Sequence, residues 1–173
     1  MTNTKTELIR IYIANLAAYN AGYLRGEWLD LPATDEEISE TLERIGCGEH
    51  GAEYAIHDYE SDFNLKADEY DNIFELNELI SDIDELDDDD FNMFMAYLEA
   101  VSNDINEALN ALDRCTLYAY CETLEDLAAD LVENGCFGDI PDSIINYIDY
   151  EAIARDLSFE GYTETTYGVL YHG

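Results

Sequence analysis

The sequence predicts an α+β protein made of three small units, and three observations lead to this fold class. Alternating apolar residues that are typical of strands occur near the start of the chain. A helical apolar period replaces them from about residue 68, and both patterns occur after about residue 114. We therefore expect an N-terminal α+β domain over 1–62, a central acidic helical domain over 63–113 and a C-terminal α+β domain over 114–173.

The N-terminal domain is expected to be a small sheet with one helix. The segments RIYIANL (10–16), EWLDL (27–31) and AEYAIHDYE (52–60) alternate and are rich in β-branched or aromatic residues, which predicts three strands. Between the second and third strands, Thr34 precedes an acidic first turn and Glu37 stands three residues on. This capping-box pattern, with Gly46 after the last apolar residue, predicts a helix over 35–45.

The central domain shows helical periodicity on two faces. In YDNIFELNELISDIDEL (70–86), one stripe is apolar: Ile73, Leu76, Ile80 and Ile83. A second stripe is acidic: Glu75, Glu78, Asp82 and Glu85. The helical apolar period continues through 91–112, preceded by four aspartates at 87–90, where the helix dipole favours negative charge. A cap needs only one or two of those carboxylates.

The C-terminal domain is expected to mix strands and helices. CTLYAYCE (115–122) predicts a strand, and Thr123 with Asp126 begins a helix that Gly135 ends. Pro141 begins a second helical region, 141–157, and TETTYGVLYHG (163–173) predicts a closing strand.

The net charge is the strongest indication of function. The chain has 41 Asp and Glu against 7 Lys and Arg, a formal charge of −34, yet it is 47% hydrophobic and can bury a core. The protein is therefore predicted to be a folded polyanion. This charge excludes nucleic acid and anionic membranes as direct partners, because both are polyanions, and it favours a basic protein surface.

A cytoplasmic location is expected. No segment reaches the roughly 20 uninterrupted apolar residues that a membrane span needs, and MTNTKTELIR lacks the pattern of a secretory signal. In that compartment the four cysteines are expected to be reduced and mostly buried: Cys47, Cys115, Cys121 and Cys136.

The sequence offers no convincing metal, cofactor or catalytic site. An EF-hand starting at Asp82 would need glycine at position 6 and glutamate at position 12, but Asp87 and Met93 stand there. A zinc site at Cys47, His50 and His57 lacks a fourth ligand, so His50 is better explained by a turn and His57 by a half-buried strand position. With 41 carboxylates, acidic pairs arise by chance and do not indicate acid–base catalysis. We expect no enzyme activity, no cofactor and no metal.

The acidic surface itself is the predicted site. The row Glu75–Glu78–Asp82–Glu85 contains three like-charge pairs, which cost a helix about 1 kcal/mol, and no Lys or Arg occurs from Ala67 to Asp113. Two or three such rows side by side approach the charge density of duplex DNA, about one charge per 1.7 Å. The carboxylates expected to imitate phosphates are Asp35, Glu36, Glu37, Asp62, Asp68, Glu69, Asp71, Glu75, Glu78, Asp82, Asp84, Glu85, Asp87, Asp88, Asp89 and Asp90.

Four stretches covering nearly the whole chain resemble the ArdA-type antirestriction proteins. They are RIYIANLAAYNAGYLRGEWLDLP, EYAIHDYE, FNLKADEYDNIFELNEL and NGCFGDIPDSIINYIDYEAIARDL. The resemblance implies a DNA mimic, carried by mobile genetic elements, that inhibits type I restriction–modification enzymes by occupying their DNA-binding cleft. It also implies an elongated three-domain protomer that forms a homodimer through its C-terminal domain. The cysteines match nothing in the family pattern.

The dimer contact is expected within LVENGCFGDIPDSIINYIDY (131–150), which has more apolar side chains than a small domain must bury. We expect Tyr147, Ile148 and Tyr150 at or near the two-fold interface.

Two other functions remain open from the residues alone. One is an acidic, chaperone-like binding protein for a single basic partner. The other is an acidic enzyme or cation-binding protein from a salt-rich cell, which would unfold in low salt.

Overall fold

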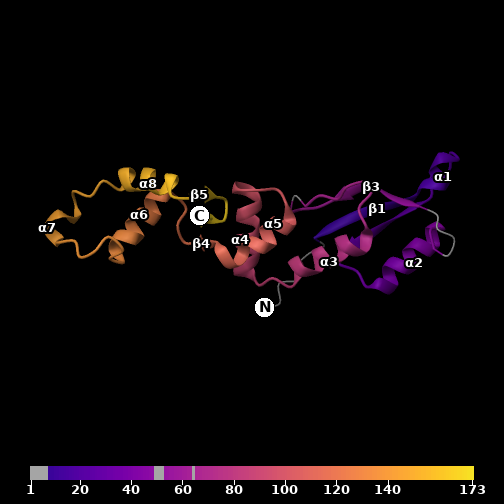
Figure 1. The fold of residues 1–173 in the computed structure, drawn as a ribbon, viewed down its shortest axis with the longest axis horizontal. Helices are drawn as coiled ribbons and strands as arrows, with labels where there is room; N and C mark the ends of the chain where they lie inside the picture. The colour runs from indigo at the N-terminus through magenta and orange to yellow at the C-terminus, as the bar shows by residue number, and fades with distance from the viewer. Residues whose placement is uncertain (1–7, 49–52, 64) are drawn as a thin grey trace. The chain divides into compact units, whose positions relative to one another are not determined.

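The protein folds into two compact units, Met1–Leu86 and Asp87–Gly173. The computed structural model describes residues 8–48, 53–63 and 65–173, and Figure 1 follows the chain through both units. Helices alternate with two three-stranded antiparallel sheets, which confirms the predicted α+β class. The boundary between the two units, after Leu86, falls within the segment that was predicted as a central domain. Whether residues 63–113 form a domain of their own stays a prediction.

The first unit has the sheet order β2-β1-β3. Its strands are β1 (Ile9–Asn15), β2 (Gly26–Leu31) and β3 (Tyr54–Glu60), which confirms the three predicted strands within one or two residues. A short helix, α1 (Leu16–Asn20), follows β1 directly and was not predicted. Ile9, Ile11 and Ile13 are fully buried, because alternate residues of a strand point to the same face.

Two helices complete the first unit. Helix α2 (Asp35–Ile45) has the predicted capping box between Thr34 and Glu37, and Gly46 ends it in the left-handed conformation, with φ of 82°. Helix α3 (Ile73–Asp84) buries the predicted apolar stripe of Ile73, Leu76, Ile80 and Ile83. Both helices pack against β2 and against each other.

The second unit begins with α4 (Asp88–Ala100), whose cap is Asp87, and α5 (Ile105–Ala111). The apolar period predicted helix throughout 91–112, but the chain breaks after Ala100 because Asp104 starts a new helix by accepting a hydrogen bond from the backbone of Glu107. A short 3-10 helix, η1 (Leu112–Arg114), follows. Helix α4 packs against all three strands of the second sheet.

The second sheet has the order β4-β6-β5, from β4 (Thr116–Tyr118), β5 (Tyr162–Thr165) and β6 (Gly168–Tyr171). The predicted strand over 115–122 is therefore only three residues long. The prediction of a single closing strand over 163–173 is wrong. The backbone N–H of Tyr167 donates to Thr165 Oγ1, and the chain turns there to form a hairpin of β5 and β6. Gly168 is required there: its φ is 128°, and a Cβ would lie 2.6 Å from the carbonyl oxygen of Tyr118.

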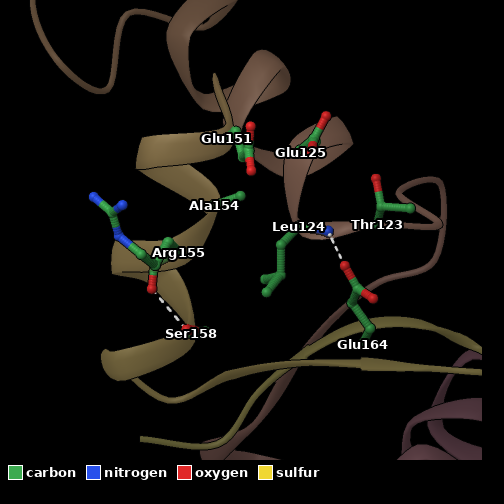
Figure 2. A pocket seen from close by; sticks show the side chains of 8 residues that line it. All are labelled: Thr123, Leu124, Glu125, Glu151, Ala154, Arg155, Ser158 and Glu164. Carbon is green, nitrogen blue, oxygen red and sulfur yellow. Dashed lines mark hydrogen bonds between the residues drawn. The ribbon is translucent and has the colours of Figure 1, made fainter. Parts of the chain in front are cut away.

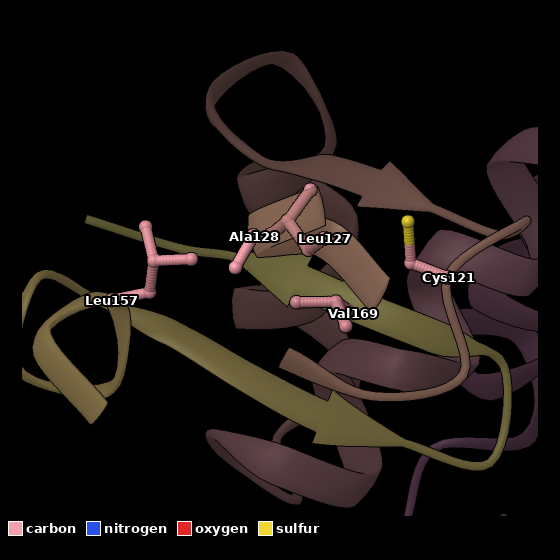
Figure 3. Packing of buried hydrophobic residues seen from close by; sticks show 5 residues of the cluster. All are labelled: Cys121, Leu127, Ala128, Leu157 and Val169. Carbon is pink, nitrogen blue, oxygen red and sulfur yellow. The ribbon is translucent and has the colours of Figure 1, made fainter. Parts of the chain in front are cut away.

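The helices of this unit are α6 (Leu124–Glu133), α7 (Asp142–Ile145) and α8 (Tyr150–Phe159). The capping box of Thr123 and Asp126 is present as predicted, whereas the helical region after Pro141 is divided, because Asp149 caps a separate helix. Helices α6 and α8 pack together over the sheet. Figure 3 shows the buried cluster between them: Cys121, Leu127, Ala128, Leu157 and Val169.

The cysteines are all free, and two of the four are buried. Cys47 and Cys121 are buried, Cys115 is half-buried and Cys136 is exposed, so the prediction of mostly buried thiols is correct for half of them. Burial raises the pKa of the Cys47, Cys115 and Cys121 thiols. Protonated thiols are poor nucleophiles and poor metal ligands.

A candidate acidic interaction surface

The acidic row predicted on α3 is exposed along its full length. Glu75, Glu78, Asp82 and Glu85 lie at the surface while the opposite face of the helix is buried. With a rise of 1.5 Å per residue, the row spans about 15 Å, a length over which a DNA duplex carries about nine charges. One row therefore supplies under half the charge density of a duplex, and carboxylates from other elements are needed.

The first turn of α2 supplies three more carboxylates, Asp35, Glu36 and Glu37, and all three are exposed. The backbone N–H and the hydroxyl group of Thr34 both donate to Glu37 Oε2, at 2.8 Å each. These hydrogen bonds lower the pKa of Glu37, so this carboxylate remains charged well into acid.

A buried asparagine ties α2 to α3. Asn77, which is only 7% exposed, accepts from the backbone N–H of Ala33 at 2.7 Å and donates to the carbonyl oxygen of the same residue at 2.8 Å. Ala33 comes immediately before the cap of α2, and Asn77 is next to Glu78 of the acidic row. The two acidic segments are thus held to one another by two hydrogen bonds from the Asn77 side chain to the backbone of a residue 44 positions away, which we call the Asn77 clamp. Sequence reasoning missed Asn77, because an asparagine in a helix gives no signal of so distant a partner.

Apart from Asp84, the last residue of α3, the remaining carboxylates of the predicted set fall into two groups. Asp62, Asp68, Glu69 and Asp71 belong to the connection between β3 and α3, and Asp71 accepts a hydrogen bond from the backbone of Asp68. Asp87–Asp90 belong to the other compact unit, where Asp87 accepts from the backbone of Asp90 and caps α4. Asp71 and Asp90 are half-buried, and all other members of the predicted set are exposed.

Three arginines of the described residues pair with carboxylates outside the predicted set. Arg10 pairs with Asp30, Arg44 with Glu27 and Glu40, and Arg155 with Asp156. Leaving Asp84 aside, no predicted phosphate surrogate forms an ion pair within the described part of the chain. The carboxylates in the first turn of α2 and in the row Glu75–Glu78–Asp82–Glu85 therefore offer uncompensated charge to an approaching basic surface.

The residues predicted at the dimer contact are in different environments. Tyr147 is 85% exposed, and Phe137 and Ile144 in the same segment are 55% and 51% exposed. Ile148 is half-buried, and Tyr150 packs against the buried cluster of the second unit. Tyr147 is therefore available to a partner, whereas Tyr150 already contributes to its own core.

A surface hollow of about 420 Å³ lies in the second unit (Figure 2). Its polar lining includes Glu125, Glu151 and Glu164, and Glu164 accepts from the backbone N–H of Leu124 at 2.7 Å. The hydroxyl group of Ser158 donates to the carbonyl oxygen of Arg155, and the lining contains neither His nor Cys. The hydroxyl group of Thr123, which also lines the hollow, donates to Asp126 as part of the cap of α6.

The alternative of a zinc site, and the structural roles expected for His50 and His57, are tested only in part. His57 is a half-buried residue of β3 and its ring packs edge-on against Tyr19, 4.7 Å between centroids, as expected for a structural residue. His50 lies outside the described residues. Among the residues that the structure describes, no group of three His, Cys, Asp or Glu is arranged to hold a metal ion, and no helix is long and apolar enough to cross a membrane.

These features define an acidic α+β protein whose most distinctive surface is formed by unneutralised carboxylates in the first turn of α2 and in the row Glu75–Glu78–Asp82–Glu85. A comparison with protein-family models matches residues 11–171 to the family described as Antirestriction protein (ArdA). The chain therefore belongs to the ArdA family of antirestriction proteins, which confirms the resemblance seen in the sequence. A search of curated proteins found no match. Membership of this family implies antirestriction function and a restriction–modification enzyme as partner.

Proposed function

We propose that the protein is a DNA mimic that inhibits type I restriction–modification enzymes without catalysing a reaction. Its carboxylates take the places of phosphates in the DNA-binding cleft, where lysine and arginine side chains of the enzyme bind them by charge-assisted hydrogen bonds. The observation that carries this proposal is the exposed, uncompensated charge of the carboxylates in the first turn of α2 and in the row Glu75–Glu78–Asp82–Glu85.

The clamp at Asn77 supports the proposal because a mimic must hold its charges in place before binding. A flexible acidic segment would lose conformational entropy on entering the cleft, whereas helices α2 and α3 are already fixed to each other. The buried faces of both helices further restrict their motion.

Competition with DNA tests this function. Purified type I methyltransferase core is mixed with labelled duplex DNA and titrated with the protein near physiological salt. The proposal expects stoichiometric displacement of the DNA and no binding of DNA to the protein itself. No displacement, even in low salt, would contradict it and would favour an acidic binding protein for a single basic partner.

We also propose that the active form is a homodimer with Tyr147 at its interface and Ile148 beside it. The exposed apolar side chains of Phe137, Ile144 and Tyr147 support this proposal, because large aromatic residues are enriched in interfaces and are rarely left in water together. Tyr150 then supports the interface indirectly, because it packs this segment against the buried cluster of its own unit. Sedimentation that finds only monomer at micromolar concentration would contradict the dimer.

A further inference from the structure

Strand β2 is an edge of the first sheet, and its outer side is open. Asn15 donates to the carbonyl oxygen of Arg25 at 2.8 Å, which fixes the alternation of hydrogen-bonded pairs between β1 and β2. By this alternation Trp28 and Asp30 belong to pairs that exchange no hydrogen bonds, so their backbone N–H and C=O groups point away from β1. In the described part of the chain, no backbone group from another segment binds this side of β2. The opposite edge differs, because Ile56 of β3 donates to the carbonyl oxygen of Glu69.

A hollow of about 310 Å³ runs along this open side. Trp28, Leu29 and Asp30 line it from the strand, and Glu37, Glu40, Thr41 and Arg44 line it from α2. Trp28 and Leu29 are neighbours in a strand and point to opposite faces of the sheet. A hollow that both residues line therefore lies along the strand edge, within reach of the free backbone groups.

The charges around this groove favour a cationic occupant. Three of its lining residues are carboxylates, Asp30, Glu37 and Glu40, against one cation, Arg44. Arg10 pairs with Asp30 at 3.0 Å, and Arg44 binds Glu27 at 2.9 Å and reaches Glu40 only at 3.7 Å, so the carboxylates still outnumber the cations. The pKa of Glu37 is lowered by its hydrogen bonds with Thr34, so its charge is present at neutral pH. The ring of Trp28 already accepts one guanidinium group, that of Arg10, at 5.4 Å.

We propose that this groove binds an extended, basic segment of a protein partner as an additional strand next to β2. The backbone of the segment pairs with Trp28 and Asp30, and its lysine or arginine side chains reach Glu37 and Glu40. Proteins commonly block open edges with lysine or proline, but β2 contains neither within Gly26–Leu31. The inference rests on the proposed function only in taking the partner to be a basic protein, and it does not involve the acidic row of α3.

A peptide titration tests the inference, because Trp28 is the only tryptophan of the chain and its fluorescence reports on the groove. The first probe is an eight-residue peptide of alternating arginine and valine. The second is the same peptide methylated at every backbone nitrogen, which keeps the charge and removes the donors for strand pairing. Near physiological salt we expect the first peptide to change Trp28 fluorescence and to bind roughly ten-fold more tightly than the second, as a few backbone hydrogen bonds would provide. Equal affinities, or no change at Trp28, would overturn the proposal.

A matched pair of variants locates the binding site. Glu40→Gln removes a groove carboxylate and should weaken peptide binding roughly three-fold, whereas Glu36→Gln makes the same charge change on the same helix outside the groove and should leave affinity unchanged. Equal weakening by both would show non-specific attraction and overturn the proposal. A change in Trp28 fluorescence on raising protein concentration without peptide would assign the edge to a second copy, and would also overturn it. Because neither probe uses α3, this inference and the DNA-mimic function can fail separately.

Discussion

The clamp between α2 and α3 makes Asn77→Ala the most informative single substitution. The change removes both hydrogen bonds to Ala33 and leaves a backbone donor and acceptor without their partners. Each unsatisfied group costs about 1–3 kcal/mol when fully buried, but Ala33 is half-buried and water can reach it in part. We therefore expect the free energy of unfolding of the first unit to fall by about 2 kcal/mol.

Urea unfolding followed by Trp28 fluorescence measures this loss in the unit that contains the clamp. The matched control is Asn20→Ala, which makes the same chemical change at an exposed position of the same unit and should alter stability by less than about 0.5 kcal/mol. The variant should also displace DNA less well at temperatures where it is still folded, because the first turn of α2 is no longer fixed to α3. A stability loss no larger than that of the control would refute the role of Asn77.

Three further substitutions test other parts of the structure. Thr34→Ala removes the cap of α2 and should cost about 1 kcal/mol. It should also let the pKa of Glu37 rise toward its ordinary value, measured by carboxyl NMR. Since that pKa is lowered in the folded state, the stabilisation is present at neutral pH and is lost as pH falls through the folded pKa, so wild type and variant should converge in acid. Leu127→Ala in the fully buried cluster of the second unit should cost about 2–5 kcal/mol in thermal unfolding. Tyr147→Ser should leave unfolding of the dilute, monomeric protein unchanged, because the side chain is 85% exposed in one protomer, yet shift sedimentation at higher concentration toward monomer.

Each of these expectations has a contradicting result. An unchanged pKa of Glu37 in Thr34→Ala would show that the hydroxyl group of Thr34 does not help to lower it, since the backbone N–H of residue 34 still donates in the variant. A loss below about 1 kcal/mol for Leu127→Ala would show that the cluster repacks around the missing side chain. A Tyr147→Ser protein that sediments like wild type would remove this residue from the interface.

Local features of the fold could be predicted from the sequence because they depend on neighbouring residues. Thr34 with Glu37 and Thr123 with Asp126 are capping boxes whose partners are three residues apart, and both are present. The alternation of 10–16 and the apolar stripe of α3 likewise reflect the geometry of one element, and both are confirmed.

Features that depend on distant residues could not be predicted. The bond from Asn77 to Ala33 joins residues 44 apart, and the β5–β6 hairpin depends on Gly168 fitting against Tyr118 of β4. The break between α4 and α5 was missed for another reason: the apolar period continues across it, while Asp104 acts locally as a cap. Of the candidate site, the sequence predicted which carboxylates are exposed, but not that two acidic helices are joined.

Neutralising the acidic row of α3 tests the central claim most directly. In the DNA competition assay, the quadruple variant Glu75→Gln, Glu78→Gln, Asp82→Asn and Glu85→Gln is compared with a control that makes the same change in charge in the second unit, Glu125→Gln, Glu133→Gln, Glu151→Gln and Glu160→Gln. Both variants reduce the negative formal charge from −34 to −30, since four carboxylates are neutralised in each. The account predicts that the α3 variant displaces DNA roughly ten-fold less well than the control. Equal potency of the two variants, in low and high salt alike, would contradict it.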